Sequence, residues 1–395
     1  MEQTTRSFPP INFKHRFPAL DGIRALAITM VFLLHYGGGT HGGALLRLFN
    51  SVRLHGWMGV DLFFVLSGFL ITGILYDTRD QPHFFRLFFA RRSLRIFPVF
   101  YLIAVVLLVL TPVVGYEWRW GHLAFLAYLG NVAGGIDPTL YSVAAGQHPA
   151  GRLTLIHLWS LCVEEQFYLL WPMVVWRVRD RVRLIQVAAG LSAAALVLRV
   201  VLMLQWPNHQ GWIVQSLPSR MDTLLLGGIL ALLLRGPDSD RWQRACKWVF
   251  LTGIACAIAI FIASPGLESP WLNSIGYTFI AAAGAGLIGS TLRTGSPSFR
   301  LFHLRPLRVL GKYSYGFYLY SLPCQYAWVR LAGLAGTKLH STVLGTTLVM
   351  GTNALVTFLV AKLSYDLFEV RFLRFKRHFE YDSGVAEHRR AFTTR

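Results

Sequence analysis

The chain has few charged residues, and those few are unequally divided. Only 14% of its 395 residues are charged, with 38 Lys and Arg against 19 Asp and Glu, whereas an average globular protein has about 25% charged residues. Hydrophobic residues make up 54% of the chain, and the mean hydropathy is +0.46. This composition excludes a soluble globular protein, a disordered chain and a coiled coil. It is typical of an integral membrane protein.

Cysteine is also scarce. Cys162, Cys246, Cys256 and Cys324 lie in or beside apolar segments and share no metal-like spacing, so we expect small core residues rather than a disulfide framework or a metal site. Internal repeats, low-complexity tracts and a polar stretch long enough for a soluble domain are not found. The first apolar segment is long and lacks a small-residue cleavage site, so we expect a retained span and no cleavable signal peptide.

Long apolar segments dominate what is present. A helix needs about 20 apolar residues to cross a bilayer core, and this criterion predicts an all-α, polytopic bundle. The ten predicted spans are 19–36, 57–76, 94–112, 157–176, 184–204, 218–234, 248–264, 272–291, 312–332 and 342–365. An eleventh stretch, 121–134, is too short to span, and we expect it to form one re-entrant or interfacial helix.

The distribution of Lys and Arg predicts the orientation. With a cytoplasmic N-terminus and ten spans, 28 of the 38 Lys and Arg fall in inside segments and five in outside loops. This bias follows the positive-inside rule, so the excess of Lys and Arg indicates insertion in a membrane rather than binding to nucleic acid. We therefore expect cytoplasmic termini, with segment 1–16, one transmembrane domain over 17–375 and a disordered tail over 376–395.

Ionisable residues within spans are costly and mark functional candidates. In the first span Arg24 and His35 are eleven residues apart, which places them on one helical face about 16 Å apart along the axis. Asp21 can pair with Arg24. The alternative is a snorkelling Arg with an interfacial His. Because Arg24 and His35 share one face of the helix with the Asp21 pair, we favour a functional role over this alternative.

Further candidates cluster toward the outer ends of other spans. Asp61 opens the second span, where Ser67 and Gly68 favour close helix packing. In the fourth span His157 and Glu164 share a face, while Glu165 is turned by about 100°. One glutamate could be purely structural, but two adjacent ones indicate function more strongly.

Arginines provide the remaining candidates. Arg220 and Asp222 lie at the outer end of the sixth span, either as a local ion pair or in contact with the acceptor, and we expect Arg199 to pair with a glutamate. At the cytoplasmic boundary Arg92 and Arg95 are three residues apart and project together, so they form either a phosphate-binding pair or a positive-inside anchor.

These residues lie in motifs that resemble acyltransferase family 3, the polytopic bacterial membrane acyltransferases. The resemblance covers about 17–375. It rests on LDGIRALAITMVFLLHY, GVDLFFVLSGFLIT, RRSLRIFPVFY and LWSLCVEEQFYLLWP in the expected order, with weaker matches in SRMDTLLLG and GKYSYGFYLYSLP. One departure is Ser321, where relatives often carry His. The resemblance implies a multi-pass protein of the bacterial inner (plasma) membrane.

The resemblance also implies the chemistry. Acyl-CoA, with acetyl-CoA as the default, would be a cytoplasmic donor substrate rather than a permanently bound cofactor, and a hydroxyl of a carbohydrate or glycoconjugate would be the acceptor. The functional Arg and His of the family match Arg24 and His35, its Arg-x-x-Arg matches Arg92 and Arg95, and its Glu matches Glu164 or Glu165. Together with the positions of the ionisable residues, this leads us to expect the following roles: catalysis for His35, Asp61, Glu164 and Glu165, donor binding for Arg24, Arg92 and Arg95, and acceptor or structural polar contacts for His157, Arg220 and Asp222.

We expect His35 to act as general base, oriented by one of the three carboxylates. Direct transfer and an acyl-histidine intermediate both stay open. Some family members carry a fused periplasmic hydrolase-like domain. We expect this chain to lack one, so that a second acyl-handling step would need a separate partner.

Two other function classes fit intramembrane His, Asp and Arg: a proton-coupled transporter, and a polysaccharide polymerase or flippase. Transporters usually show inverted repeats with paired broken helices, and no such symmetry is visible in this sequence. The oligomeric state is open.

Overall fold

The computed structural model describes residues 17–35, 49, 52–114, 118–141, 154–264, 269–334 and 343–381. Within these ranges the regular secondary structure is helical, and no extended strand is formed. The segment 1–16, the residues between 142 and 153, and the tail from 382 onward lie outside the described residues.

The described helices divide into two compact units. The first draws on residues up to Leu26, on Asp61–Tyr76 and on Met173–Gly311. It contains α8 (Arg181–Gln205), α9 (Gln210–Gln215), α10 (Leu217–Leu233), α11 (Ser239–Ala263), η6 (Leu272–Gly276), α12 (Tyr277–Thr291), α13 (Pro297–Phe302) and most of α14 (Arg305–Lys312).

The second unit draws on Ala27–Val60, Asp77–Pro172 and Lys312 onward. It contains α4 (Phe84–Val114), α5 (Leu123–Leu126), α6 (Gly130–Ile136), α15 (Ser314–Leu334), α16 (Val343–Ser364), η8 (Tyr365–Glu369), α17 (Val370–Arg374) and η9 (Phe375–Phe379). Besides α14, three helices contribute to both units: α1 (Pro18–His35), α3 (Met58–Thr78) and α7 (Leu158–Arg177).

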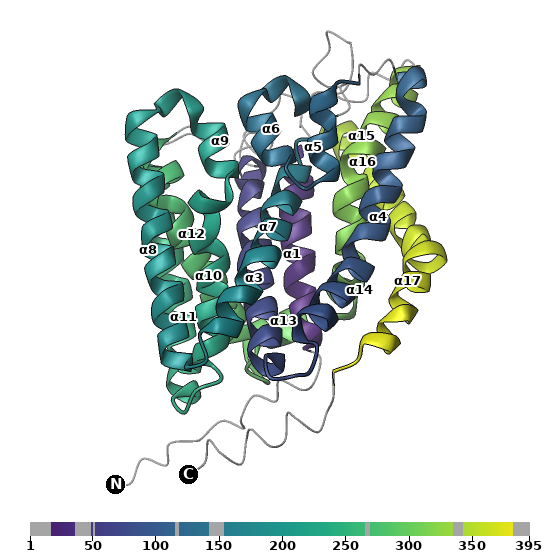
Figure 1. Ribbon diagram of the computed structural model, residues 1–395. Coiled ribbons are helices and arrows are strands. Elements are labelled where there is room, and N and C mark those ends of the chain that lie inside the picture. The colour runs from purple at the N-terminus through teal and green to yellow at the C-terminus, as the bar shows by residue number, and fades with distance from the viewer. Residues whose placement is uncertain are drawn as a thin grey trace. The chain divides into compact units, whose positions relative to one another are not determined.

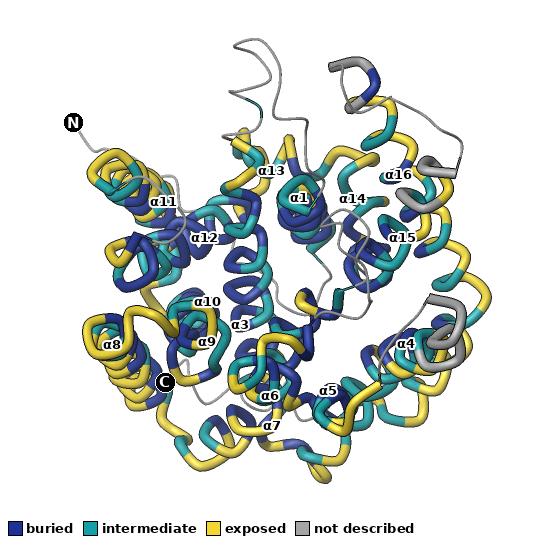
Figure 2. The backbone as a smooth tube through the Cα atoms, turned by 90° about the horizontal axis from the view of Figure 1, so that it is seen from above, coloured by how far each residue is buried: buried dark blue, intermediate teal, exposed yellow. Residues whose placement is uncertain are grey.

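The most apolar helices of the first unit are the least buried. α8 and α11 pack against α10 and α12 (Figure 1), and their outward faces are exposed while α10 is mostly buried (Figure 2). Leu204 on α8 is 74% exposed and Ile262 on α11 is 77% exposed. Exposed apolar faces of this kind are suited to lipid and not to water.

Helices are found at all ten predicted spans. Six helices are long and apolar enough to cross a membrane: α1, α3 with the turn before it, α8, α11, η6 with α12, and α16 with its C-terminal continuation. A seventh is reached if Pro207–Gln215 and α10, which meet at 47°, count as one broken span. The described chain is therefore an all-helical, multi-pass membrane protein.

Small residues bring α3 and α10 together within the first unit. A Cβ on Gly68 would overlap the carbonyl oxygen of Leu224, and one on Gly227 would overlap that of Val65. Close backbone approach at small residues is the usual packing mode of membrane helices. The prediction of close packing at Gly68 is confirmed.

The sequence suggested one short helix over 121–134, but the structure forms shorter pieces there. It forms a 3-10 turn (Trp120–His122), then α5 and α6, with a break at Tyr128, whose φ is 54°. The side-chain amide of Gln166 holds this break by donating to the Tyr128 carbonyl at 2.9 Å and to Asn131 Oδ1 at 2.8 Å. Tyr128 also stacks on Phe100 at 4.5 Å between ring centroids. These contacts stabilise a left-handed residue that apolar periodicity does not reveal.

Candidate active site

His35 ends α1 with one ring nitrogen held and the other available. Nδ1 lies 2.8 Å from the carbonyl oxygen of Val31, one turn earlier. Because a carbonyl can only accept, Nδ1 carries the proton, and in the neutral ring Nε2 has a free lone pair. The side-chain amide of Gln325 on α15 donates to the His35 carbonyl at 2.9 Å and fixes the helix end.

The group that orients His35 differs from the expectation. The sequence suggested a carboxylate, from Asp61, Glu164 or Glu165, but the Nδ1 partner is the Val31 carbonyl. A residue one turn back in the same helix is always within reach of a histidine at the helix end, so this bond needs no second helix. The tautomer it selects is the one that a carboxylate would also select.

A second histidine, His157, lies beside α15. It directly precedes α7, is 4% exposed, and meets the Tyr318 ring edge-on at 5.5 Å between centroids. The Tyr318 hydroxyl donates to the His157 carbonyl at 2.5 Å and lies 2.7 Å from the Ser160 hydroxyl. Within the described chain neither ring nitrogen of His157 makes a hydrogen bond of regular geometry, although the ring lies close to the backbone of Leu319. His35 is close enough to act on it electrostatically.

Unpaired buried imidazole nitrogens are costly, at about 1–3 kcal/mol for a donor or acceptor left unsatisfied. Native structures leave few such groups, and those that remain need an explanation. Two neighbouring histidines with unoccupied nitrogens fit a site where a polar ligand completes the hydrogen bonds. Tyr318 and Ser160 were not singled out from the sequence. The only signal for them was their position in the two family motifs.

Glu164 and Glu165 lie with Arg92 rather than with His35. The Arg92 guanidinium stacks on the Tyr168 ring at 3.9 Å from its centroid, and both glutamates act on it electrostatically. Arg92 Nε and Glu165 Oε1 are buried without a hydrogen-bond partner among the described groups. α4 and α7 thus form a second polar cluster, two to three turns along α7 from His157.

Arg95 lies one turn after Arg92 on α4 and is exposed. Glu369 of η8 acts on it electrostatically. Arg24 pairs with Asp21 at 2.5 Å in the first turns of α1, as the spacing predicted. Ser321 is buried, and its hydroxyl donates to the Tyr318 carbonyl at 2.8 Å.

The suggested local pairing of Arg220 with Asp222 is wrong. Arg220 pairs with Asp61 on α3, and Asp222 pairs with Arg199 on α8. The physical reason is helical geometry: residues two apart on α10 point about 200° apart, so each reaches a different neighbouring helix.

The two ion pairs differ in how well they are satisfied. Arg199 makes a bidentate pair with Asp222 at 2.8 Å for both contacts and also donates to the Ser274 carbonyl at 2.6 Å and to Thr278 at 2.7 Å. In contrast, Arg220 keeps Nε and Nη1 without hydrogen bonds to the described residues, although its guanidinium lies 4.0 Å from the Tyr277 ring centroid. The first pair is structural in character.

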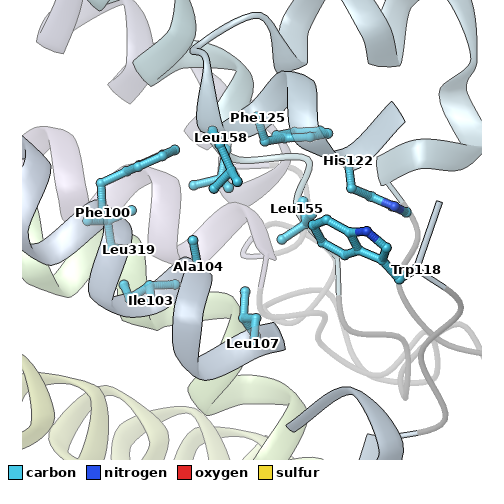
Figure 3. Close-up of a pocket in the computed structure, with 11 residues that line it drawn as sticks. Phe100, Ile103, Ala104, Leu107, Trp118, His122, Phe125, Leu155, Leu158 and Leu319 are labelled. Carbon is cyan, nitrogen blue, oxygen red and sulfur yellow. The ribbon is translucent and has the colours of Figure 1, made fainter. Parts of the chain in front are cut away.

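An apolar pocket opens beside α4 in the second unit. Figure 3 shows its walls: Phe100, Ile103, Ala104 and Leu107 from α4, with Trp118, His122, Phe125, Leu155, Leu158 and Leu319 around them. His122 is buried, and burial lowers its pKa. His122 was not a sequence candidate. The pocket reaches Leu158, the residue next to His157.

Comparison with known proteins gives a consistent result. A family model described as an acyltransferase domain matches residues 17–362. The O-acetyltransferase OatA of Staphylococcus aureus (strain NCTC 8325 / PS 47) is 30% identical over 324 residues, covering 78% of this chain and 50% of that protein. The peptidoglycan O-acetyltransferase OatA of Listeria monocytogenes is 27% identical over 385 residues, covering 93% and 57%.

A putative peptidoglycan O-acetyltransferase of Bacillus subtilis, YrhL, is 30% identical over 373 residues, covering 90% of this chain and 55% of that protein. The chain thus spans about half the length of the curated relatives it matches. No solved structure matches it.

Proposed function

The chain belongs to acyltransferase family 3, and from this premise we propose that it is a membrane O-acetyltransferase that uses acetyl-CoA to acetylate a glycan hydroxyl. Three relatives are named as O-acetyltransferases, two of them for peptidoglycan. A peptidoglycan-type saccharide is therefore the first acceptor to test. The alternatives, a transporter and a polymerase or flippase, require no acyl donor.

One observation carries the mechanism: the bond from Nδ1 to Val31 leaves His35 Nε2 as an acceptor. Nε2 takes the proton of the acceptor hydroxyl as its oxygen attacks the thioester carbonyl carbon. The carbon–sulfur bond then breaks, and the leaving thiolate takes the proton from Nε2. The products are the acetyl ester and free CoA. The neutral His157 ring has an unpaired N–H to offer the tetrahedral oxyanion.

The donor is proposed to lie along α4 and α7. Arg92 and Arg95 would bind phosphates of CoA, and Arg24 would contact the pantetheine arm. Glu164 and Glu165 would balance Arg92 while no donor is bound, a role that replaces the expected orientation of His35. Asp61 with Arg220, and His157, are proposed to contact the acceptor or its surroundings.

We further propose ten spans with both termini in the cytoplasm of a bacterial plasma membrane. The support is the concentration of Lys and Arg on one side of that arrangement. Acetyl-CoA is then taken from the cytoplasm and the hydroxyl acceptor is met toward the outer face.

The test is transfer from radiolabelled acetyl-CoA to peptidoglycan fragments by the full chain in nanodiscs. His35→Ala should lower the rate at least about 100-fold, the usual contribution of a general base. His209→Ala is the matched control because His209 is exposed, and it should keep the wild-type rate. Equal rates in wild type and His35→Ala would refute the role of His35. Absence of acetyl-CoA turnover with every acceptor would refute the enzyme.

A further inference from the structure

The helical segment that follows α16 lies along α4. η8, α17 and η9 all contact α4 (Figure 1). Arg91 on α4 donates to the Phe379 carbonyl at 2.9 Å, and its guanidinium lies 4.9 Å from the Tyr381 ring centroid. Glu369, at the start of the segment, acts on Arg95. The segment is therefore fixed to α4 at both ends.

This attachment brings Lys376 to the arginines of α4. Lys376 lies on η9 and is half-buried, and Arg91, Arg92 and Arg95 all act on it electrostatically. Four cationic side chains from two segments far apart in the sequence thus converge. This convergence is not predicted from the sequence, which led us to expect a disordered tail over 376–395.

The carboxylates nearby act on other members of the cluster. Glu369 acts on Arg95, and the α7 glutamates act on Arg92. In the part of the chain that the structure describes, no carboxylate is paired with Lys376, and every charge that acts on it is positive. Holding an ammonium group among three guanidinium groups is unfavourable unless an anion joins them.

The members of the cluster are suited to different tasks. Arg91 is engaged with Phe379 and Tyr381, so it positions the segment. Arg92 has a buried Nε without a hydrogen-bond partner among the described groups, and Arg95 is exposed. Guanidinium groups bind phosphate through two parallel hydrogen bonds, whereas an ammonium adds a mobile point charge. A phosphate ester carrying several charges matches this combination.

We propose that Lys376 is a donor-binding residue that joins Arg92 and Arg95 in binding the phosphate groups of acyl-CoA. This inference rests on the proposed function. It makes the C-terminal helical segment part of the donor site rather than a passive extension of α16. The same cations could instead hold the phosphate of an anionic lipid, so the experiment separates the two sources.

The test is binding of CoA to the full chain in phosphatidylcholine nanodiscs, measured by calorimetry. Lys376→Gln should raise the Kd for CoA about tenfold, the effect of losing one charge-assisted contact. Lys376→Arg should recover most of the affinity. Arg377→Gln is the matched control: it removes one positive charge from the adjacent, exposed position of η9 and should bind CoA as the wild type does.

Pantetheine, which has no phosphate, provides the second measurement. Its Kd should be the same for wild type and Lys376→Gln, which also shows that the variant is folded. An equal weakening of CoA and pantetheine would mean that Lys376 is structural and would overturn the proposal, as would an unchanged Kd for CoA.

Two further outcomes separate the alternatives. If Lys376→Gln leaves CoA binding intact but abolishes a preference for phosphatidylglycerol in the nanodisc, the cluster is a lipid site and the inference is wrong. If the wild type binds no CoA at all, both the role of Lys376 and the proposed donor are wrong. If the wild type binds CoA and Lys376→Gln has the same Kd, only the role of Lys376 is wrong.

Discussion

Asp222→Asn tests whether the pair that Arg199 forms with Asp222 is a structural pair. Both side chains are fully buried, and Arg199 donates to Asp222 twice, to Thr278, and to the carbonyls of Ser219 and Ser274. The substitution keeps the shape of the side chain but leaves the Arg199 charge without its counter-ion. Breaking a buried ion pair from one side costs about 3–5 kcal/mol, so we expect a loss of that size in the free energy of unfolding.

The double variant Arg199→Met with Asp222→Leu distinguishes a lost attraction from a stranded charge. Replacing a whole buried pair by apolar residues of similar volume is often neutral or stabilising. Here three other acceptors of Arg199 lose a donor, so some cost remains, but it should be smaller than that of Asp222→Asn. Asp238→Asn, at an exposed carboxylate before α11, should change stability by less than about 0.5 kcal/mol.

The assay is equilibrium unfolding in mixed micelles, followed by tryptophan fluorescence. A loss below about 1 kcal/mol in the free energy of unfolding of Asp222→Asn would refute a structural role for the pair, because removing a buried, fully hydrogen-bonded counter-ion costs more than that. A double variant less stable than the single one would refute the stranded-charge argument.

The remaining predictions concern a helix contact and the histidine site. Gly68→Ala should destabilise the chain by about 1–3 kcal/mol in the same unfolding assay, because the new Cβ overlaps the Leu224 carbonyl. The control Gly190→Ala, at a position with open space around it, should be neutral or slightly stabilising. Equal losses of stability in the two variants would contradict the packing argument. Tyr318→Phe removes the hydroxyl that contacts Ser160 and the His157 carbonyl, so acetyl transfer should fall about tenfold with CoA binding unchanged. Tyr320→Phe, two residues along α15, should transfer normally, and a Tyr318→Phe enzyme with the wild-type rate would exclude Tyr318 from the site.

The sequence predicted the helices well because the membrane makes the signal strong. Six of the helices are long and apolar enough to cross a membrane. The bounds of the helices at the ten predicted segments fall within a few residues of the predicted ones except at α4, which begins at Phe84, and α11, which begins at Ser239. Both extensions are N-terminal and rich in Arg and Lys, so hydropathy alone begins the predicted span too late. The break at Tyr128 was missed because it depends on Gln166, which is distant in sequence.

Pairing between charged residues was harder to predict. Within one helix the spacing sufficed, as for Asp21 with Arg24. Across helices it did not, because the partner depends on which face of α10 meets which neighbour. Arg220 and Asp222 are two residues apart yet engage Asp61 and Arg199. Charged residues within spans were correctly identified as candidates from the sequence, but the ion-pair partner of each could be found only from the structure.

α7 connects the two polar clusters of the second unit, and this connection constrains the donor. His157 precedes the helix, and Tyr168, on which Arg92 stacks, lies eleven residues later. At 1.5 Å per residue the two levels are about 16 Å apart along the axis. A donor whose phosphates lie at Arg92 can present its thioester to the histidines only through an extended arm parallel to α7. A compact donor would not reach, so the separation itself favours a thioester on a long pantetheine arm over a small acyl phosphate.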